Sequence, residues 1–415
     1  MQTVKLVFLG LVLLAVQGVA LAQSSTNSPN SQYGYGNLAD RAFISQRGMG
    51  GIGYGLRNSQ SINSMNPAAF SAVDSMTFMF DLGISGQSVW QKENGIKEQK
   101  FNGNLEYIAM QFPLAKKLGF GAGFEPVSYV GYSYMETDTL KIPGDWKYAI
   151  YMGRGGFSKV YVDLSYEWWD RISVGVKLSY LFGDKTKNII FSNSITGSNS
   201  TTTTDTLRAY GFLYDFGVQY HYSVGKFRTV TIGAIYSPKI RIGAKVMKGE
   251  ISSGSTNITN IVSKDSVFEM PETFGLGFTY NRLGKVTAGA DILYQRWAAV
   301  KYYDKTDTLN NRLKFNLGGE WIPNYTGTGI LNRIRYRAGV YYANSYLNVK
   351  GAKYNEYGLT LGLGIPTPNR RSFVNLAFEY SRVKPDLKNF VDEQYFKISL
   401  SYTFNELWFS KLKVQ

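Results

Sequence analysis

The stretch Phe396-Lys397-Ile398-Ser399-Leu400-Ser401-Tyr402-Thr403-Phe404 alternates apolar and polar side chains without a break. Side chains of a β-strand point alternately to its two faces, so this period of two predicts a strand with one apolar and one polar face. The pattern recurs along most of the 415 residues, and no long apolar helix replaces it. Behind a secretory leader, such strands predict a closed antiparallel barrel whose outer face contacts lipid.

A signal peptide is predicted at residues 1–22. Lys5 supplies a positive charge, an apolar run follows from Leu6 to Val16, and Ala20-Leu21-Ala22 ends the leader with small residues before cleavage at Gln23. An uncleaved helical anchor is the alternative, but the run is short and no stop-transfer flank follows it. The leader therefore favours export and, with the strands, an outer-membrane location.

Composition narrows the possible chemistry. The chain has no cysteine and one histidine, His221, so thiolate metal sites, thiol nucleophiles and multi-histidine metal sites are excluded. His221 falls at a predicted periplasmic turn without an evident nucleophile, which argues against an enzyme; no cofactor is expected. Tyr, Phe and Trp number 31, 25 and 7, an excess that interfacial aromatic girdles would use.

The formal net charge is +15, but the basic residues are scattered along the chain. A secreted protein meets no nucleic acid, so nucleic-acid binding is not expected. The basic residues could instead meet anionic lipid headgroups or sugars, and the sequence does not decide between these partners.

Fourteen strands are predicted within a barrel at residues 75–404, with an error of two. The mean hydropathy of −0.19 fits a barrel, because polar lumen residues offset the apolar lipid-facing ones. A soluble β-sandwich or propeller would show less consistently aromatic faces. The predicted strands are Met76–Ser88, Asn104–Pro113, Leu118–Val130, Val160–Trp168, Ile172–Tyr180, Tyr210–Tyr220, Phe227–Tyr236, Phe268–Tyr280, Val286–Tyr294, Leu313–Trp321, Arg335–Tyr342, Tyr357–Ile365, Phe373–Tyr380 and Tyr395–Phe404.

The connections alternate in length, as expected for short periplasmic turns and long extracellular loops. Residues 405–415 would form a short periplasmic tail. Before the barrel, Gln23–Gln32 reads as disordered, whereas the Gly-rich Tyr33–Val73 reads as a compact irregular segment that packs on something else. The long loops are predicted at Gly131–Trp146, Asp184–Thr206, Met247–Ser266, Lys301–Arg312 and Val383–Gln394.

Several motifs in order resemble the FadL/TodX family of outer-membrane transporters for hydrophobic compounds. The ending is similar to a branch found in bacteria with type IX secretion. The resemblance covers essentially the whole mature chain. Its motifs are Arg47-Gly48-Met49-Gly50-Gly51-Ile52-Gly53, Asn66-Pro67-Ala68-Ala69, Gly153-Arg154-Gly155-Gly156-Phe157, Leu181-Phe182-Gly183, Met270-Pro271-Glu272-Thr273-Phe274-Gly275-Leu276-Gly277 and Asn405-Glu406-Leu407-Trp408-Phe409.

The resemblance implies a hatch inside the lumen, within residues 23–74, and a lateral wall opening at a kinked strand. Glu125-Pro126 is the candidate kink, because proline removes a ladder donor; an ordinary bend is the alternative. Residues 57–64 depart from the family's small and acidic pattern. The hatch or gating residues would be Gly48, Gly50, Gly51, Asn66, Pro67 and Ala68, and the apolar residues that could line a ligand pocket, or only pack the plug, are Phe43, Ile44, Met49, Ile52, Met65 and Phe70.

Inward-facing charges are predicted on several strands. Glu320 can meet Arg335 and Arg337 across a strand pair, either as a site for a substrate carboxylate or as a structural network that holds the plug, which we favour. The wider set is Asp163, Glu167, Lys177, Asp215, Asp291, Glu320, Arg335, Arg337 and Glu379.

Two functions fit the sequence. The favoured one is passive uptake of hydrophobic small molecules such as long-chain fatty acids, since no ATP site or energy-coupling box appears. The alternative is a structural or substrate-binding subunit of a multi-protein outer-membrane machine. The expected partners are outer-membrane lipid and a hydrophobic ligand, with an outer-membrane protein as the partner under the alternative. Tyrosines would suit protein contact or an aromatic girdle at Tyr129, Tyr132, Tyr134, Tyr302, Tyr303, Tyr341, Tyr342 and Tyr346.

Overall fold

The computed structural model describes most of the chain after residue 25. The predicted signal peptide and residues 408–415 of the predicted tail lie outside the described residues. No helix of the described part is long and apolar enough to cross a membrane. The described ranges are 26–93, 95–139, 146–193, 200–252, 259–264, 267–349, 351–387 and 390–407.

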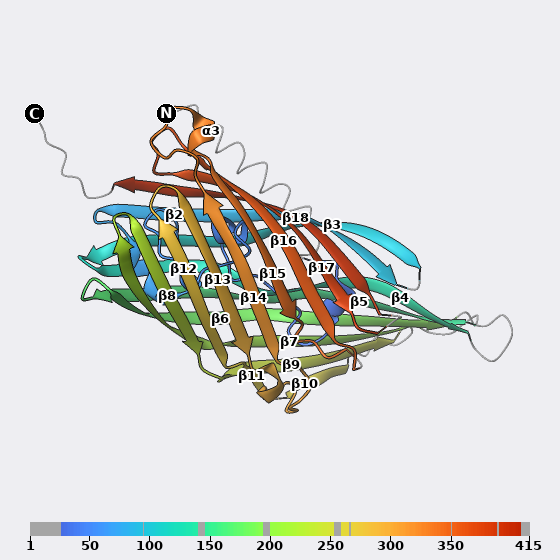
Figure 1. Cartoon of the computed structure of the whole chain (residues 1–415). Helices are drawn as coiled ribbons and strands as arrows, with labels where there is room; N and C mark the ends of the chain where they lie inside the picture. Colours follow the sequence, from blue (N-terminus) through green and yellow to red (C-terminus); the bar gives the residue numbers. More distant parts are fainter. Residues whose placement is uncertain are drawn as a thin grey trace, which may run out of the picture.

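The strands form a closed antiparallel barrel of 14 spanning strands, as predicted (Figure 1). The last strand pairs with the first from Asp392↔Lys92 to Leu407↔Thr77, which closes the wall. Strand bounds are β2 (Thr77–Glu93), β3 (Ile96–Ala115), β4 (Leu118–Thr139), β5 (Trp146–Trp168), β6 (Ile172–Asn193), β7 (Thr201–Gly225), β8 (Arg228–Ser237), β9 (Ile240–Ser252), β10 (Thr259–Lys264), β11 (Phe268–Met270), β12 (Thr273–Arg282), β13 (Val286–Gln295), β14 (Arg312–Trp321), β15 (Arg335–Asn344), β16 (Tyr354–Pro366), β17 (Phe373–Pro385) and β18 (Asp392–Leu407).

Two spanning strands are broken by proline. Pro238 separates β8 from β9, and Pro271 separates β11 from β12, at the same level of the wall. Proline lacks a backbone donor, so the ladder stops at Met270↔Ile240 and resumes at Thr273↔Ser237. These pieces, with β10, therefore count as two spanning strands.

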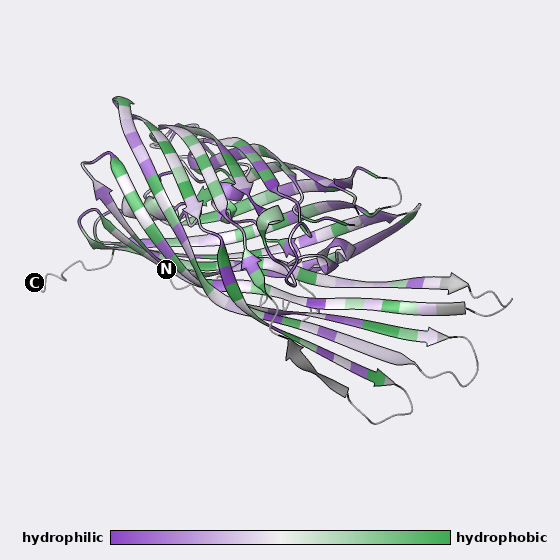
Figure 2. Ribbon diagram, turned by 90° about the horizontal axis from the view of Figure 1, so that it is seen from below, coloured by the Kyte–Doolittle hydropathy of each residue, from purple (hydrophilic) through white to green (hydrophobic). Residues whose placement is uncertain are grey.

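The strands β4–β7 are much longer than a membrane requires. They contain 22, 23, 22 and 25 residues, whereas a spanning strand needs about 9–11. Much of the predicted loops Gly131–Trp146, Asp184–Thr206 and Met247–Ser266 is therefore strand, which corrects the prediction. Strand ends project beyond the rest of the barrel in Figure 2. Cross-strand pairing such as Ile190↔Thr202 continues the ladder there through residues that favour β-structure.

Alternate residues face lipid where the sequence predicts it. On β5, Val160, Leu164 and Trp168 are 44–52% exposed, whereas Tyr161 and Asp163 are buried. The rim with short turns also holds the barrel's first and last strand ends, Thr77 and Leu407. That rim is periplasmic and the opposite end is extracellular, as in other outer-membrane barrels.

Residues 26–74, here called the inner segment, lie inside the barrel. Helix α2 contacts β16, β17 and β18, and helix η2 contacts β4–β7. Thr26–Gln32, predicted as disordered, is instead packed: the Ser28 amide donates to the Gly131 carbonyl at 2.8 Å. The elements of the inner segment are η1 (Pro29–Gln32), β1 (Asn37–Leu38), α2 (Ile44–Arg47) and η2 (Pro67–Ala72).

Candidate functional site

The wall is open between β3 and β4 on the extracellular side. Their ladder runs from Ala115↔Leu118 to Ile108↔Phe124 and stops there. Beyond it, residues 96–107 of β3 pair only with β2, and residues 125–139 of β4 pair with β5. The register with β5 also shifts between Pro126 and Ser128. The predicted kink at Glu125-Pro126 thus lies where the wall gap begins.

The inner segment bridges this wall gap. Strand β1 pairs with β4 at Asn37↔Tyr129 and Leu38↔Ser128. On the other side, the Asn27 amide donates to Asn102 Oδ1 of β3 at 2.6 Å. Residues 27–38 therefore connect the two separated strands from inside, with most of their hydrogen bonds on the β4 side.

A cavity of about 250 Å³ lies in the lumen beside the wall gap. Its lining includes the kink residues Glu125 and Pro126 and the strand residue Leu38. Charged and apolar side chains both line it, for example Lys159 beside Leu213. The cavity therefore suits a molecule that has both a polar and an apolar part.

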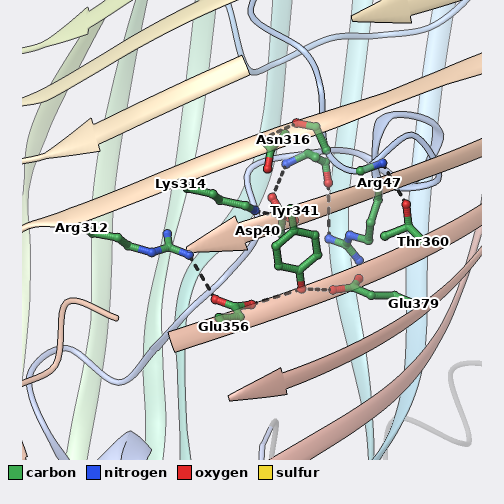
Figure 3. Close-up of polar contacts among 12 residues, drawn as sticks. Asp40, Arg47, Arg312, Lys314, Asn316, Tyr341, Glu356, Thr360 and Glu379 are labelled. Carbon is green, nitrogen blue, oxygen red and sulfur yellow. Dashed lines mark hydrogen bonds and ion pairs between the residues drawn. The ribbon is translucent and has the colours of Figure 1, made fainter. Parts of the chain in front are cut away.

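A polar network joins the inner segment to β14–β17 next to the cavity (Figure 3). Lys314 Nζ lies 3.3 Å from Asp40 Oδ2, and Arg312 lies 3.5 Å from Glu356. The Tyr341 hydroxyl lies 2.6 Å from Glu379 Oε1 and 3.2 Å from Glu356 Oε1. Burial alone would raise the pKa of Asp40, but the cations Lys314 and Arg47 lower it to about 2. Asp40 therefore stays ionised at physiological pH.

A buried ion triad anchors α2 to the wall. Arg47 lies 2.9 Å from Glu106 Oε2 of β3, and Lys397 of β18 lies 2.6 Å from Glu106 Oε1. The side chains of Arg47 and Glu106 are each 2% exposed. Removing one partner would leave an uncompensated buried charge, so the triad holds α2 firmly in place.

A sequence model of the BamG family matches residues 3–415. The chain belongs to the BamG family. A search of characterised proteins by sequence found no match.

Several solved structures have the same fold, which agrees with the predicted barrel. The toluene transporter TbuX of Ralstonia pickettii is 15% identical over 88% of this chain and 98% of its own, with a TM-score of 0.57. The toluene transporter TodX of Pseudomonas putida is 15% identical over 90% and 100%, with a TM-score of 0.57. A FadL homologue of Pseudomonas aeruginosa is 14% identical over 89% and 98%, also at 0.57. At such identities the likeness shows the fold.

The proposed gating residues fall in two places of the inner segment. Gly48 and Gly50 follow α2 and pass close to the wall, where the Gly50 amide donates to Thr360 Oγ1 at 2.9 Å. Gly51 adopts a positive φ of 79° next to it. Asn66 caps η2 by accepting from the Ala68 amide at 3.0 Å, with Pro67 as the first helical residue.

Of the six apolar residues predicted to line a pocket, Met65 lines the cavity. The other five fill the contact between the inner segment and the wall. Phe43 stacks on Tyr107 with ring centroids 3.7 Å apart. Ile44 and Phe70 belong to the same buried cluster, whereas Met49 and Ile52 pack with each other. An apolar side chain in the inner segment can either line a cavity or pack against the wall, and the sequence does not distinguish the two.

Several predicted lumen charges bond to one another or to the inner segment. Glu320 lies 2.7 Å from Arg337 and 3.6 Å from Arg335. Asp291 accepts from the backbone amides of Gly53 and Tyr54 at 2.6 and 2.9 Å. Further contacts to the inner segment join Glu167 to Arg57, Lys177 to the Ser64 carbonyl, Arg335 to Gln60, and Asp215 to Arg41.

Most of the predicted surface tyrosines face inward, which corrects the girdle and protein-contact interpretations. Tyr346 and Tyr302 donate to the carbonyls of Gly36 and Gly34 in the inner segment. Tyr132 and Tyr341 are buried, Tyr134 donates to Gln32, and Tyr129 is half-buried. Tyr303 and Tyr342 remain exposed. His221 lies at the periplasmic rim, 3.9 Å from Glu167.

The polar network and the ion triad were not predicted from the sequence. No pattern grouped the residues of these two clusters, although four of them lie on strands at positions that face inward. These four are Glu106, Lys314, Tyr341 and Lys397, and Asp40 lies in the inner segment. Listing every polar residue at an inward position would have found those four. Their partners in the inner segment carry no periodic signal and could not be assigned.

Proposed function

We propose that this protein is an outer-membrane channel for passive uptake of hydrophobic small molecules such as long-chain fatty acids. The ligand would occupy the cavity and leave sideways through the wall gap between β3 and β4. The observation that carries the proposal is the end of the β3–β4 ladder at Ile108↔Phe124, directly beside the cavity. Lateral release suits an apolar ligand because the ligand moves from the lumen into lipid without crossing water.

The mixed cavity lining supports a ligand with a polar head and an apolar tail. Trp297, Leu293 and Met65 offer apolar surface, and burying it gains about 25 cal/mol per Å². On the same wall, Arg312 and Lys314 carry further N–H donors beyond those that pair with Glu356 and Asp40. A fatty acid would place its carboxylate near these cations and its chain against the apolar residues.

Residues 27–39 would act as the gate. They bridge the wall gap, with the hydrogen bond to β3 from Asn27 and their other bonds across the gap to β4, whereas α2, further along the inner segment, is fixed by the buried triad. In this scheme the gate shifts while Gly48, Gly50, Gly51, Asn66, Pro67 and Ala68 keep the rest of the inner segment docked. Movement of about a dozen residues then opens a path past Glu125 and Pro126.

Locking the gate to β4 is expected to abolish uptake. Leu38 and Ser128 are directly opposite in an antiparallel pair, a spacing that a disulfide can bridge. The natural chain has no cysteine, so the Leu38→Cys/Ser128→Cys variant forms a single defined cross-link. When the disulfide is formed, uptake of radiolabelled oleate by proteoliposomes should fall at least about tenfold, because the cross-link blocks the gating motion. Uptake should recover after the disulfide is reduced.

The matched control cross-links two wall strands. Thr186 and Thr206 have hydroxyl oxygens 3.2 Å apart across β6 and β7, away from the wall gap. The Thr186→Cys/Thr206→Cys variant should keep its uptake when oxidised. Unchanged uptake in the oxidised gate variant would contradict the proposal.

A second candidate is a protein-binding subunit of a multi-protein outer-membrane machine. It is favoured by an apolar row on the projecting strands, formed by Met135, Ile150, Ile190 and Ile251. Each residue lies opposite the next on the neighbouring strand, from β4 through β5, β6 and β7 to β9. Thr202 of β7 stands between Ile190 and Ile251 in this row. Met135 and Ile251 are 62% and 50% exposed, beyond the length of strand that lipid covers.

Charging this apolar row is expected to remove a bound partner, if the second candidate holds. In a pull-down with mild detergent, wild type should retain a stoichiometric protein and the Ile190→Asp variant should lose it, because a buried unpaired carboxylate is costly at an interface. Phe191→Asp is the control, since Phe191 is exposed on the opposite face of β6. Recovery of the chain alone from wild type would rule out this candidate.

A further inference from the structure

Six basic residues are exposed along the periplasmic rim. They lie in or next to four of the short turns, those that join β3–β4, β5–β6, β7–β8 and β12–β13. We call this set the basic arc; it consists of Lys116, Arg171, Lys226, Arg228, Arg282 and Lys285.

The charges of the basic arc are not neutralised by neighbouring carboxylates. The four turns contain one acidic residue, Asp170. It forms an ion pair with Lys117, which does not belong to the basic arc. None of the six makes an ion pair with a carboxylate of the described residues. Arg171 and Lys226 instead lie over the rings of Tyr222 and Phe227, at 5.7 and 5.6 Å.

Most of the basic arc forms one continuous surface, because neighbouring turns are hydrogen-bonded. The His221 amide donates to the Arg171 carbonyl at 2.8 Å. The Leu283 amide donates to the Phe227 carbonyl at 2.9 Å, and this bond joins the β7–β8 and β12–β13 turns. These turns therefore present their cations side by side along the rim.

The basic arc lies at the depth of lipid headgroups. Trp168 and Trp169 beside Arg171, Phe227 beside Lys226, and Leu283 beside Arg282 are all exposed. Exposed aromatic residues at the end of a lipid-facing band mark the interface between hydrocarbon and headgroups. Cations among them are placed to meet phosphate groups, not the open periplasm.

The extracellular end has a different charge pattern. There, cations alternate with carboxylates and several form pairs, such as Lys100 with Glu98 at 3.0 Å and Arg382 with Asp392. The periplasmic rim differs because its exposed cations are gathered in four turns that contain a single carboxylate, Asp170. These cations account for part of the net charge of +15.

We propose that the basic arc binds the phosphate groups of anionic phospholipids in the inner leaflet of the outer membrane. Phosphatidylglycerol and cardiolipin present such phosphates at this depth, and clustered Lys and Arg near a membrane surface attract them. An acidic periplasmic protein is the competing partner. The interleaved aromatic residues favour lipid, because they need the apolar environment that a bilayer supplies. The proposal does not depend on what the barrel transports.

The test compares lipids retained by the full chain. Wild-type protein in nanodiscs of phosphatidylcholine and phosphatidylglycerol is released for native mass spectrometry, and the bound lipids are counted. We expect wild type to retain phosphatidylglycerol over phosphatidylcholine by about tenfold, and less at high salt. A variant with all six residues changed to glutamine should lose this preference. Equal retention of both lipids by wild type would overturn the proposal and favour the acidic protein.

Two controls keep the result specific. The first replaces six exposed extracellular lysines with glutamine, namely Lys92, Lys97, Lys248, Lys301, Lys305 and Lys353. This control has the same net charge as the arc variant and should keep the preference; its loss would show a general charge effect and contradict the proposal. The second is the smaller variant Lys116→Gln/Arg228→Gln/Lys285→Gln, which replaces the six-residue variant if that one does not fold; its preference should fall at least about threefold.

Discussion

The Glu106→Ala variant is expected to lose about 3–5 kcal/mol of its free energy of unfolding. Glu106 pairs with both Arg47 and Lys397 inside the barrel, and the Arg47 side chain is 2% exposed. Without the carboxylate, Arg47 stays buried without the counter-ion that it contacts directly. Urea unfolding from lipid vesicles, followed by tryptophan fluorescence, measures the loss.

Glu98→Ala is the matched control for this prediction. Glu98 lies on the same strand β3 and pairs with Lys100 at 3.0 Å, but its side chain is 57% exposed. Exposed pairs contribute about 0–1 kcal/mol, so the control should unfold almost as wild type does. Similar small losses in both variants would show that the triad does not anchor α2.

The Gly50→Ala variant is expected to lose about 2–4 kcal/mol, from backbone strain and from overpacking. Gly50 has a φ of 70°, and an added Cβ would lie 2.7 Å from the Leu317 carbonyl oxygen. The clash is with backbone atoms of β14 and β15, which cannot rotate away. The same urea titration reports the loss, and limited proteolysis should cut the inner segment faster.

Gly95→Ala separates the two causes. Gly95 also has a positive φ, 87°, but no atom lies within 4 Å of an added Cβ. It should therefore show the backbone strain alone, about 1–2 kcal/mol. If Gly50→Ala costs no more than Gly95→Ala, the inner segment does not press against the wall at this point.

The spanning part of the fold was predictable from the sequence. Alternation along Val160–Trp168 marks a lipid face and a lumen face, and a shift by one residue would exchange them. The same argument gave fourteen strands and their order. It could not give the ends of β4–β7, because the hydrophobic signal stops at the membrane surface while pairing continues through residues such as Thr202.

The candidate site was predictable only in part. Pro126 located the wall gap, since a missing backbone donor is visible in the sequence. The pairing of Arg47 with Glu106 joins residues 59 positions apart, and neither sequence neighbourhood indicates the other. Phe43 and Met65 are both apolar residues of the inner segment, yet packing against Tyr107 places the first away from the cavity.

The pairing of β18 with β2 also constrains how the molecule can assemble. Residues 26–74 precede β2 and end up enclosed by the wall that β2 and β18 complete. From inside the barrel, α2 contacts β16, β17 and β18, close to the seam where β18 pairs with β2. The two strands that close the ring are the first and the last of the wall, so closure joins parts of the chain at least 300 residues apart. Any route to the native state must bring these two strands together with residues 26–74 inside them, and the contact of α2 with β18 ties the enclosed residues to the closing strand.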